Sequence, residues 1–174
     1  MTQKKGQKGF SLVELLIVVA IIGIVAAIAI PNLLASRRAA NEGSAISSLR
    51  TINSSEATYA SSTGNGNFGS LAELGGANLV DAQLTATRKS GYLFDVTEVD
   101  QVINATGAVT TLPSYHATAI PLTPGAGPTQ TGTRRFGTSQ IGVIVADSTV
   151  GNLGTVLTVS EINAPVAPIL PIGN

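Results

Sequence analysis

Hydrophobic and polar residues are divided sharply at the start of the chain. Residues 1–9 form a short leader with three lysines and no acid, and residues 10–35 that follow are almost entirely apolar. The single charge within this run of 26 residues is Glu14. As a helix the run would be roughly 39 Å long, enough to cross a hydrocarbon core of about 30 Å. The pattern therefore predicts a membrane-spanning helix with one carboxylate near its start.

Helical periodicity continues beyond the apolar run. One face of this continuation is apolar and contains Ile46, Leu49, Ile52 and Tyr59. The charged residues Arg37, Arg38, Arg50 and Glu56 are expected on the other faces. A cluster of glycine, asparagine and serine at residues 61–68 ends the pattern. One long helix is thus expected over residues 10–60, membrane-spanning in its first half and amphipathic in its second.

Residues 61–174 predict a globular head. Ser70 and Glu73 have capping-box spacing, so a short helix is expected up to Gly75 and Gly76, with a second helical turn in residues 78–87. Alternating polarity and turn residues then predict strands over residues 92–97, 108–112, 115–120, 134–138 and 141–146. The tail carries Pro165, Pro168 and Pro171 and is expected to be extended. The fold class is α+β, a long N-terminal helix packed on a small antiparallel sheet.

Two interpretations of the N-terminal segment compete. In the first it is a secretory signal peptide that is cut after Ala29, which releases a soluble exported binding protein. In the second the chain is cut after Gly9, and the apolar run stays on the mature protein. The second is favoured, because Glu14 lies inside what should be an uncharged segment and because helical character continues beyond Ala29.

The N-terminal motif resembles that of type IV prepilins, a class III signal peptide with an N-terminal methylation motif. The resemblance is carried by residues 8–16, KGFSLVELL, by the apolar run, and by Pro31-Asn32-Leu33. It implies that a prepilin peptidase cuts between Gly9 and Phe10 and that the new Phe10 amine is methylated. It also implies a subunit that waits in the inner membrane as a single-pass protein, head in the periplasm. An inner-membrane assembly machine then builds it into a helical homopolymer on the cell surface.

Within that resemblance, three further residues are expected to matter. A carboxylate at the bilayer centre costs about 2.5–3.5 kcal/mol, so Glu14 is predicted to pair with the Phe10 amine of an adjacent or the same subunit during assembly. Gly23 and Pro31 are the weak points of the helix, since proline lacks an amide proton and glycine favours the unfolded chain. The helix is expected to persist in lipid and to unwind between Gly23 and Pro31 in the filament.

Composition argues against most other chemistry. The chain has 10 basic and 10 acidic side chains, so loss of the leader would leave a net charge of −3, and binding of nucleic acid is expected to be weak or absent. No catalytic residue, cofactor site or metal site is predicted. His116 is a lone histidine, and the acids Asp95, Glu98 and Asp100 are interpreted as solvated edge charges.

Cysteine is absent. Many type IV pilins close a C-terminal loop with a disulfide, so packing or hydrogen bonds must hold that region here.

Three basic pairs remain. Arg37-Arg38 is expected where the helix leaves the bilayer, suited to headgroup phosphates or to the Glu42 of a neighbouring subunit. Arg88-Lys89 and Arg134-Arg135 are interpreted as charges that flank strands and discourage edge pairing.

The sequence thus predicts a non-enzymatic structural subunit of a type IV pilus, with roles in motility, adhesion or DNA uptake. The alternative is a type II secretion pseudopilin, and the N-terminal motif does not separate the two. Major pseudopilins often carry an acidic calcium site near the C-terminus, whereas this tail contains only Glu161 after Asp147, which favours the pilus subunit.

Overall fold

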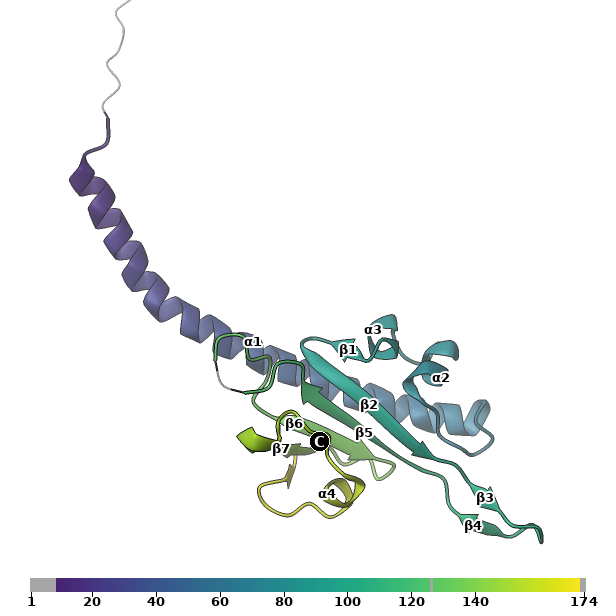
Figure 1. Cartoon of the computed structure of the whole chain (residues 1–174). Helices are drawn as coiled ribbons and strands as arrows, with labels where there is room; N and C mark the ends of the chain where they lie inside the picture. The colour runs from purple at the N-terminus through teal and green to yellow at the C-terminus, as the bar shows by residue number, and fades with distance from the viewer. Residues whose placement is uncertain (1–8, 126, 173–174) are drawn as a thin grey trace, which may run out of the picture. The chain divides into compact units, whose positions relative to one another are not determined.

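A computed structural model describes residues 9–125 and 127–172. Its first element is one α-helix, α1 (Leu12–Ser62), which runs through Pro31 without a break (Figure 1). Contacts divide the chain into two compact units, with the boundary inside α1 between Ser36 and Arg37. The first unit contains the apolar part of α1, and the second contains the rest of the helix and the head.

The head is built on a six-stranded sheet with the order β1-β2-β5-β6-β7-β8, in which every neighbouring pair is antiparallel. These strands are β1 (Arg88–Lys89), β2 (Tyr92–Val99), β5 (Ser114–Pro121), β6 (Arg135–Ser139), β7 (Val145–Asp147) and β8 (Leu170–Pro171). A separate hairpin pairs β3 (Val102–Ile103) with β4 (Val109–Thr111). The helices of the head are α2 (Leu71–Gly76), α3 (Ala82–Thr85), the 3-10 turn η1 (Val150–Asn152) and α4 (Val159–Asn163). The predicted α+β class is confirmed.

The main core lies between the second half of α1 and one face of the sheet. Ala45, Leu49 and Ile52 of α1 are completely buried there, and they belong to one cluster with Tyr92, Phe94, Phe136 and Tyr115. This is the helix face that the sequence pattern predicted. The strand alternation is confirmed as well. Tyr92 and Phe94 of β2 are buried, whereas the next residue, Asp95, is exposed.

The other face of the sheet is covered by the C-terminal segment. Val145, Leu157, Ile162 and Ile169 form a second apolar cluster there. Gly137 of β6 makes the contact possible, since a Cβ at this position would lie 2.8–3.1 Å from atoms of Ile162 and Leu157. The sheet is therefore buried on both sides at β6 and β7, between α1 and α4 (Figure 1).

Several predicted boundaries need correction. The capping box at Ser70 and the turn between residues 104 and 108 form as expected. The second hairpin also forms, but its return strand begins at Val145 instead of Ile141. The tail is not simply extended, because a second capping box at Thr158 and Glu161 starts α4, and Leu170–Pro171 then pairs with β7.

Candidate functional site

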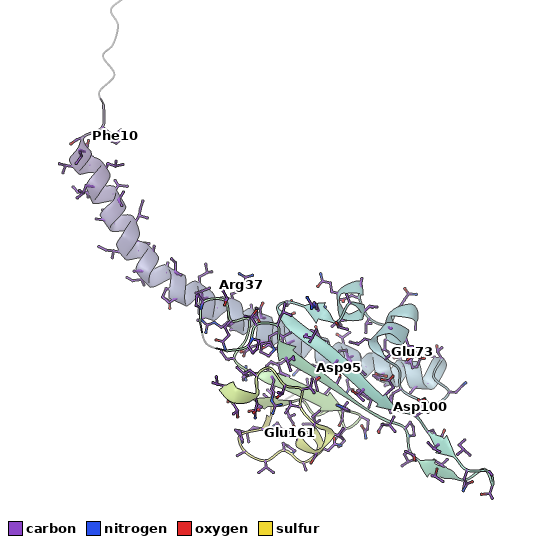
Figure 2. All side chains as sticks on the ribbon, viewed as in Figure 1. Phe10, Arg37, Glu73, Asp95, Asp100 and Glu161 are labelled. Atoms are coloured by element: carbon purple, nitrogen blue, oxygen red, sulfur yellow. The ribbon has the colours of Figure 1, made fainter. Side chains whose placement is uncertain are left out.

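The predicted cleavage point lies just before α1. Gly9 and Phe10 are exposed and non-helical, Phe10 being 92% exposed (Figure 2). A Cβ built on Gly9 would meet no atom within 4 Å. Nothing in the described part of this chain therefore requires glycine at position 9, so such a requirement would have to come from another molecule. The leader residues 1–8 lie outside the described residues.

Glu14 serves as a cap at the start of α1. Its Oε2 accepts a 2.8 Å hydrogen bond from the Ser11 backbone N–H, and Ser11 Oγ accepts a 3.3 Å bond from Val13 N–H. The Glu14 half of a capping box is present, while the Ser11 hydroxyl caps the second amide of the helix instead of the third, and both bonds satisfy backbone donors that a helix start leaves free. The Ser-x-x-Glu spacing of residues 11–14 is the sequence signal for this cap, and it was missed because Glu14 was interpreted only as an assembly residue. The carboxylate thus lies three residues into the helix, four residues after Phe10, whose amine is its predicted assembly partner.

Within the part of the chain that the structure describes, no other segment covers the apolar part of α1. Its large side chains from Leu12 to Leu33 are 49–78% exposed, and this helix is long and apolar enough to cross a membrane. Burial of a side chain such as valine, leucine or isoleucine is worth about 1.5–3 kcal/mol. An apolar surface of this extent marks a membrane or association surface.

The helix persists at both predicted weak points. Pro31 removes the amide that would donate to the Ala27 carbonyl, yet α1 continues on both sides. Asn32, the next residue, donates from Nδ2 to the Ile28 carbonyl at 3.0 Å, which adds a local side-chain bond beside the missing one. A Cβ on Gly23 would meet nothing within 4 Å. Unwinding of this stretch in a filament stays a prediction.

Residues with catalytic or ligating side chains are dispersed over the head. Asp95 lies on β2 and Asp100 beyond its end, and Glu161 lies on α4 (Figure 2). Half-buried His116 pairs in register with Thr97 and Ser139. Within residues 9–125 and 127–172, no three histidine, cysteine or acidic side chains are grouped in a way that could hold a metal ion.

Glu42 fastens the head to α1. Its Oε1 accepts from Thr133 N–H at 2.7 Å and from Thr133 Oγ1 at 2.6 Å, and its Oε2 accepts from Arg134 Nε at 2.9 Å and Nη2 at 2.8 Å. One residue earlier, Asn41 Nδ2 donates to the Thr131 carbonyl at 2.9 Å. The loop before β6 is therefore held against the helix. In the single chain the Glu42 carboxylate is bonded to Thr133 and Arg134 of its own subunit, and pairing with a neighbour's arginines stays a prediction.

Arg135 holds the C-terminal segment. Its guanidinium is 2% exposed and contacts Asp147 at 2.8 Å and Glu161 at 3.1 Å. It also donates to the carbonyls of Thr155 at 3.2 Å and Val156 at 3.0 Å. The interpretation of Arg134-Arg135 as strand-flanking edge charges is therefore wrong. Arg135 lies in β6, an inner strand, and Arg134 pairs with Glu42. The expectation that hydrogen bonds replace a disulfide in this region is met by Arg135.

Burial and hydrogen bonding act on Asp147 in opposite directions. Desolvation raises the pKa of its carboxyl, but hydrogen bonds from Thr149 and the pairing with Arg135 outweigh it and bring the pKa down to about 2. Asp147 is therefore ionised at every pH at which the head is expected to work. Its negative charge matches the buried guanidinium.

Glu56 is the most unusual ionisable group of the head. It is completely buried, its Oε2 accepts from Gly69 N–H at 2.9 Å, and its Oε1 has no partner among the described residues. Desolvation raises the pKa of Glu56 to about 7, the Gly69 bond lowers it, and the charges of Glu98 and Glu73 raise it further. Assignment of Glu56 to a solvent-facing side of the helix is wrong. Its spacing from Ile52 and Tyr59 could have identified it as a core position.

Comparison with known proteins concerns the N-terminal segment. The prokaryotic N-terminal methylation motif matches residues 4–30. The chain is also similar to the type IV wide pilus major component PilA4 of Thermus thermophilus, with 63% identity over 38 residues. This match covers 22% of the chain and 29% of the relative, so the chain spans less than a third of the relative's length. No solved structure matches the chain. The predicted resemblance is confirmed for the N-terminal segment. The head is described from its structure alone.

Proposed function

We propose that this chain, whose N-terminal segment carries the type IV pilin methylation motif, is a non-enzymatic structural subunit that polymerises through α1 into a surface filament. The observation that carries the proposal is the matched motif at the start of a helix whose apolar side chains are left uncovered by residues 9–125 and 127–172. A membrane covers such a surface before assembly, and α1 segments of other copies cover it afterwards. The PilA4 relative, a wide-pilus major component, supports this choice.

Maturation is proposed to occur by cleavage between Gly9 and Phe10, followed by methylation of the Phe10 amine. The exposed, non-helical backbone at Gly9 supports this, because a peptidase needs a segment without regular structure to enter its cleft. The uncleaved chain would wait in the inner membrane with the head in the periplasm, and an assembly machine would then draw it into the filament. The partners of the chain are thus other copies, the processing enzyme and that machine.

The type II secretion pseudopilin is the second candidate. The major form of that class is expected to carry an acidic calcium site near the C-terminus, and the two acids of this region, Asp147 and Glu161, are both paired with Arg135. Carboxylate oxygens that already accept from a guanidinium are poor ligands for a divalent cation, which would have to displace the arginine. This observation favours the pilus subunit.

N-terminal sequencing of the native protein, recovered from sheared cell-surface filaments and from the culture medium, tests the proposal. A methylated Phe10 at the N-terminus is expected, whereas an N-terminus at Ile30 would establish the soluble exported protein instead. A Gly9→Leu variant should accumulate as unprocessed chain in the membrane and produce no filaments. The matched control is Gly6→Leu, which alters the leader by the same side chain and should still be processed. Normal filaments from the Gly9→Leu strain would contradict the proposed processing.

A further inference from the structure

Two arginines stand at the point where the apolar part of the helix ends. After Glu14, the next charged residues along the chain are Arg37 and Arg38. Arg37 is exposed on α1 (Figure 2), and Arg38 is half-buried beside the loop that precedes β6. The pair therefore places two positive charges about two turns after Ile30, where an inserted helix would reach the headgroups.

The head orients Arg38 without neutralising it. Arg38 Nη1 donates to Gln130 Oε1 at 3.2 Å, which is a neutral acceptor. Its Nε is shielded from solvent and has no partner among the described residues. Gln130 itself lies next to Thr131, whose carbonyl is held by Asn41. A guanidinium has five N–H donors. The shielded Nε is closed to an acceptor outside the chain, and Nη1 already donates once, so the two donors of Nη2 and the second donor of Nη1 are left for such an acceptor.

The nearest acid is not available to either arginine. Glu42 lies four residues after Arg38, a spacing at which ion pairs normally form along a helix. Its two oxygens already accept four bonds, from the backbone and side chain of Thr133 and from two nitrogens of Arg134. A carboxylate offers about four acceptor positions. Among the described residues no ion pair involves Arg37 or Arg38.

The adjoining loop would not repel an anion. Residues 121–133, which include Gln130, contain no charged side chain. A positive pair with unused donors, a neutral loop beside it and a membrane-length helix before it fit one class of ligand, a phosphate fixed at the membrane surface.

We propose that Arg37 and Arg38 bind the phosphate of an anionic phospholipid while the subunit is in the membrane. Consecutive residues of a helix project in different directions, so each guanidinium binds headgroup phosphate on its own side of α1, and Gln130 fixes the orientation of Arg38. Phosphate is the acceptor that arginine geometry matches best, since the planar donors form paired bonds to its oxygens. The interaction rests on insertion of α1 and not on polymerisation.

Energy transfer in vesicles tests this proposal with the full chain. Since the chain has no cysteine, Ser36→Cys offers a single site for a donor dye. The labelled chain is inserted into phosphatidylcholine vesicles that contain an acyl-chain acceptor on either phosphatidylglycerol or phosphatidylcholine. The ratio of the two transfer efficiencies measures enrichment of the anionic lipid around the arginines.

The expected result is a clear preference for phosphatidylglycerol that Arg37→Gln/Arg38→Gln abolishes. Each basic side chain near an anionic surface strengthens association about fivefold, so the double variant should weaken it roughly 25-fold. Arg88→Gln/Lys89→Gln removes the same charge from the head and should keep the preference. Circular dichroism verifies that both variants are folded.

Three outcomes would overturn the proposal. The first is equal transfer efficiency to the two lipids when both Arg37 and Arg38 are present. The second is a preference for phosphatidylglycerol that survives in Arg37→Gln/Arg38→Gln. The third is a loss of that preference in the Arg88→Gln/Lys89→Gln control as large as in the arginine variant. Addition of inorganic phosphate at constant ionic strength distinguishes a free anion from a lipid. Loss of the preference would assign the pair to soluble phosphate, and its persistence supports the lipid. Because no filament is present, none of these outcomes depends on the proposed function.

Discussion

Replacement of Glu56 with glutamine should change how the stability of the head depends on pH. Glutamine keeps an oxygen that can accept the Gly69 N–H bond, and it removes a negative charge that is completely buried. The comparison of Glu56→Gln with the unmodified protein therefore isolates the ionisation of one carboxyl. The charged groups that face it are the carboxylates of Glu73 on α2 and Glu98 on β2.

The sign follows from the raised pKa. The folded state binds the Glu56 proton more tightly than the unfolded state, because the pKa rises from 4.5 to about 7 on folding. This contribution to stability is complete below pH 4.5, is lost as the pH rises to about 7, and is absent above it. Each pKa unit corresponds to 1.36 kcal/mol, which sets a maximum of about 3 kcal/mol. Solvent screening of the neighbouring carboxylates reduces the measured effect, and we expect about 2 kcal/mol.

Urea unfolding of the full chain in detergent, followed by circular dichroism at pH 4.5 and pH 8.5, measures the difference. The two proteins should be nearly equal at pH 4.5, and Glu56→Gln should be more stable by about 2 kcal/mol at pH 8.5. In a Glu98→Gln control the pH dependence should persist with a lower midpoint, since one repelling charge is gone. A free-energy difference between Glu56→Gln and the unmodified protein that is constant from pH 4.5 to pH 8.5 would refute the reasoning.

Three further predictions concern other parts of the molecule. Arg135→Met leaves Asp147 as an uncompensated buried charge and should destabilise the head by about 3–5 kcal/mol in urea unfolding, whereas Arg88→Met on the exposed first strand should cost less than 0.5 kcal/mol. Glu14→Ala should be processed normally but yield far fewer filaments by electron microscopy, and a wild-type yield would leave the carboxylate without an assembly role. A filament map should show unwound backbone between Gly23 and Pro31, and continuous helical density through this stretch would contradict that expectation.

Local patterns in the sequence were sufficient to predict most elements of the fold. The helix face of Leu49 and Ile52, the cap at Ser70 and the alternation through Phe94 each depend on spacing within a few residues. The same kind of signal was present for α4, since Thr158 and Glu161 have capping-box spacing, but the surrounding prolines suggested an extended chain. Short-range rules thus succeed wherever a feature is decided by its own segment.

The charged interior could not be predicted in the same way. Arg135 reaches Asp147, Thr155 and Glu161, which are 12, 20 and 26 residues away in sequence. Their convergence depends on the register of β6 with β7 and on the path of the chain into α4. Arginine is mostly exposed in proteins, so two consecutive arginines are interpreted as surface charges unless their distant partners are known. The link between Glu42 and Arg134, 92 residues apart, was missed for the same reason.

Because Arg135 holds the C-terminal segment, the head can fold without an oxidant. The C-terminal segment is closed by ion pairs and hydrogen bonds, and the chain has no thiol to oxidise. Such closure forms with the fold itself, whereas disulfide formation and reshuffling take seconds to hours and require an oxidant. The head should therefore reach the same folded state in anaerobic and aerated cells, and reducing agents should leave its C-terminal segment closed.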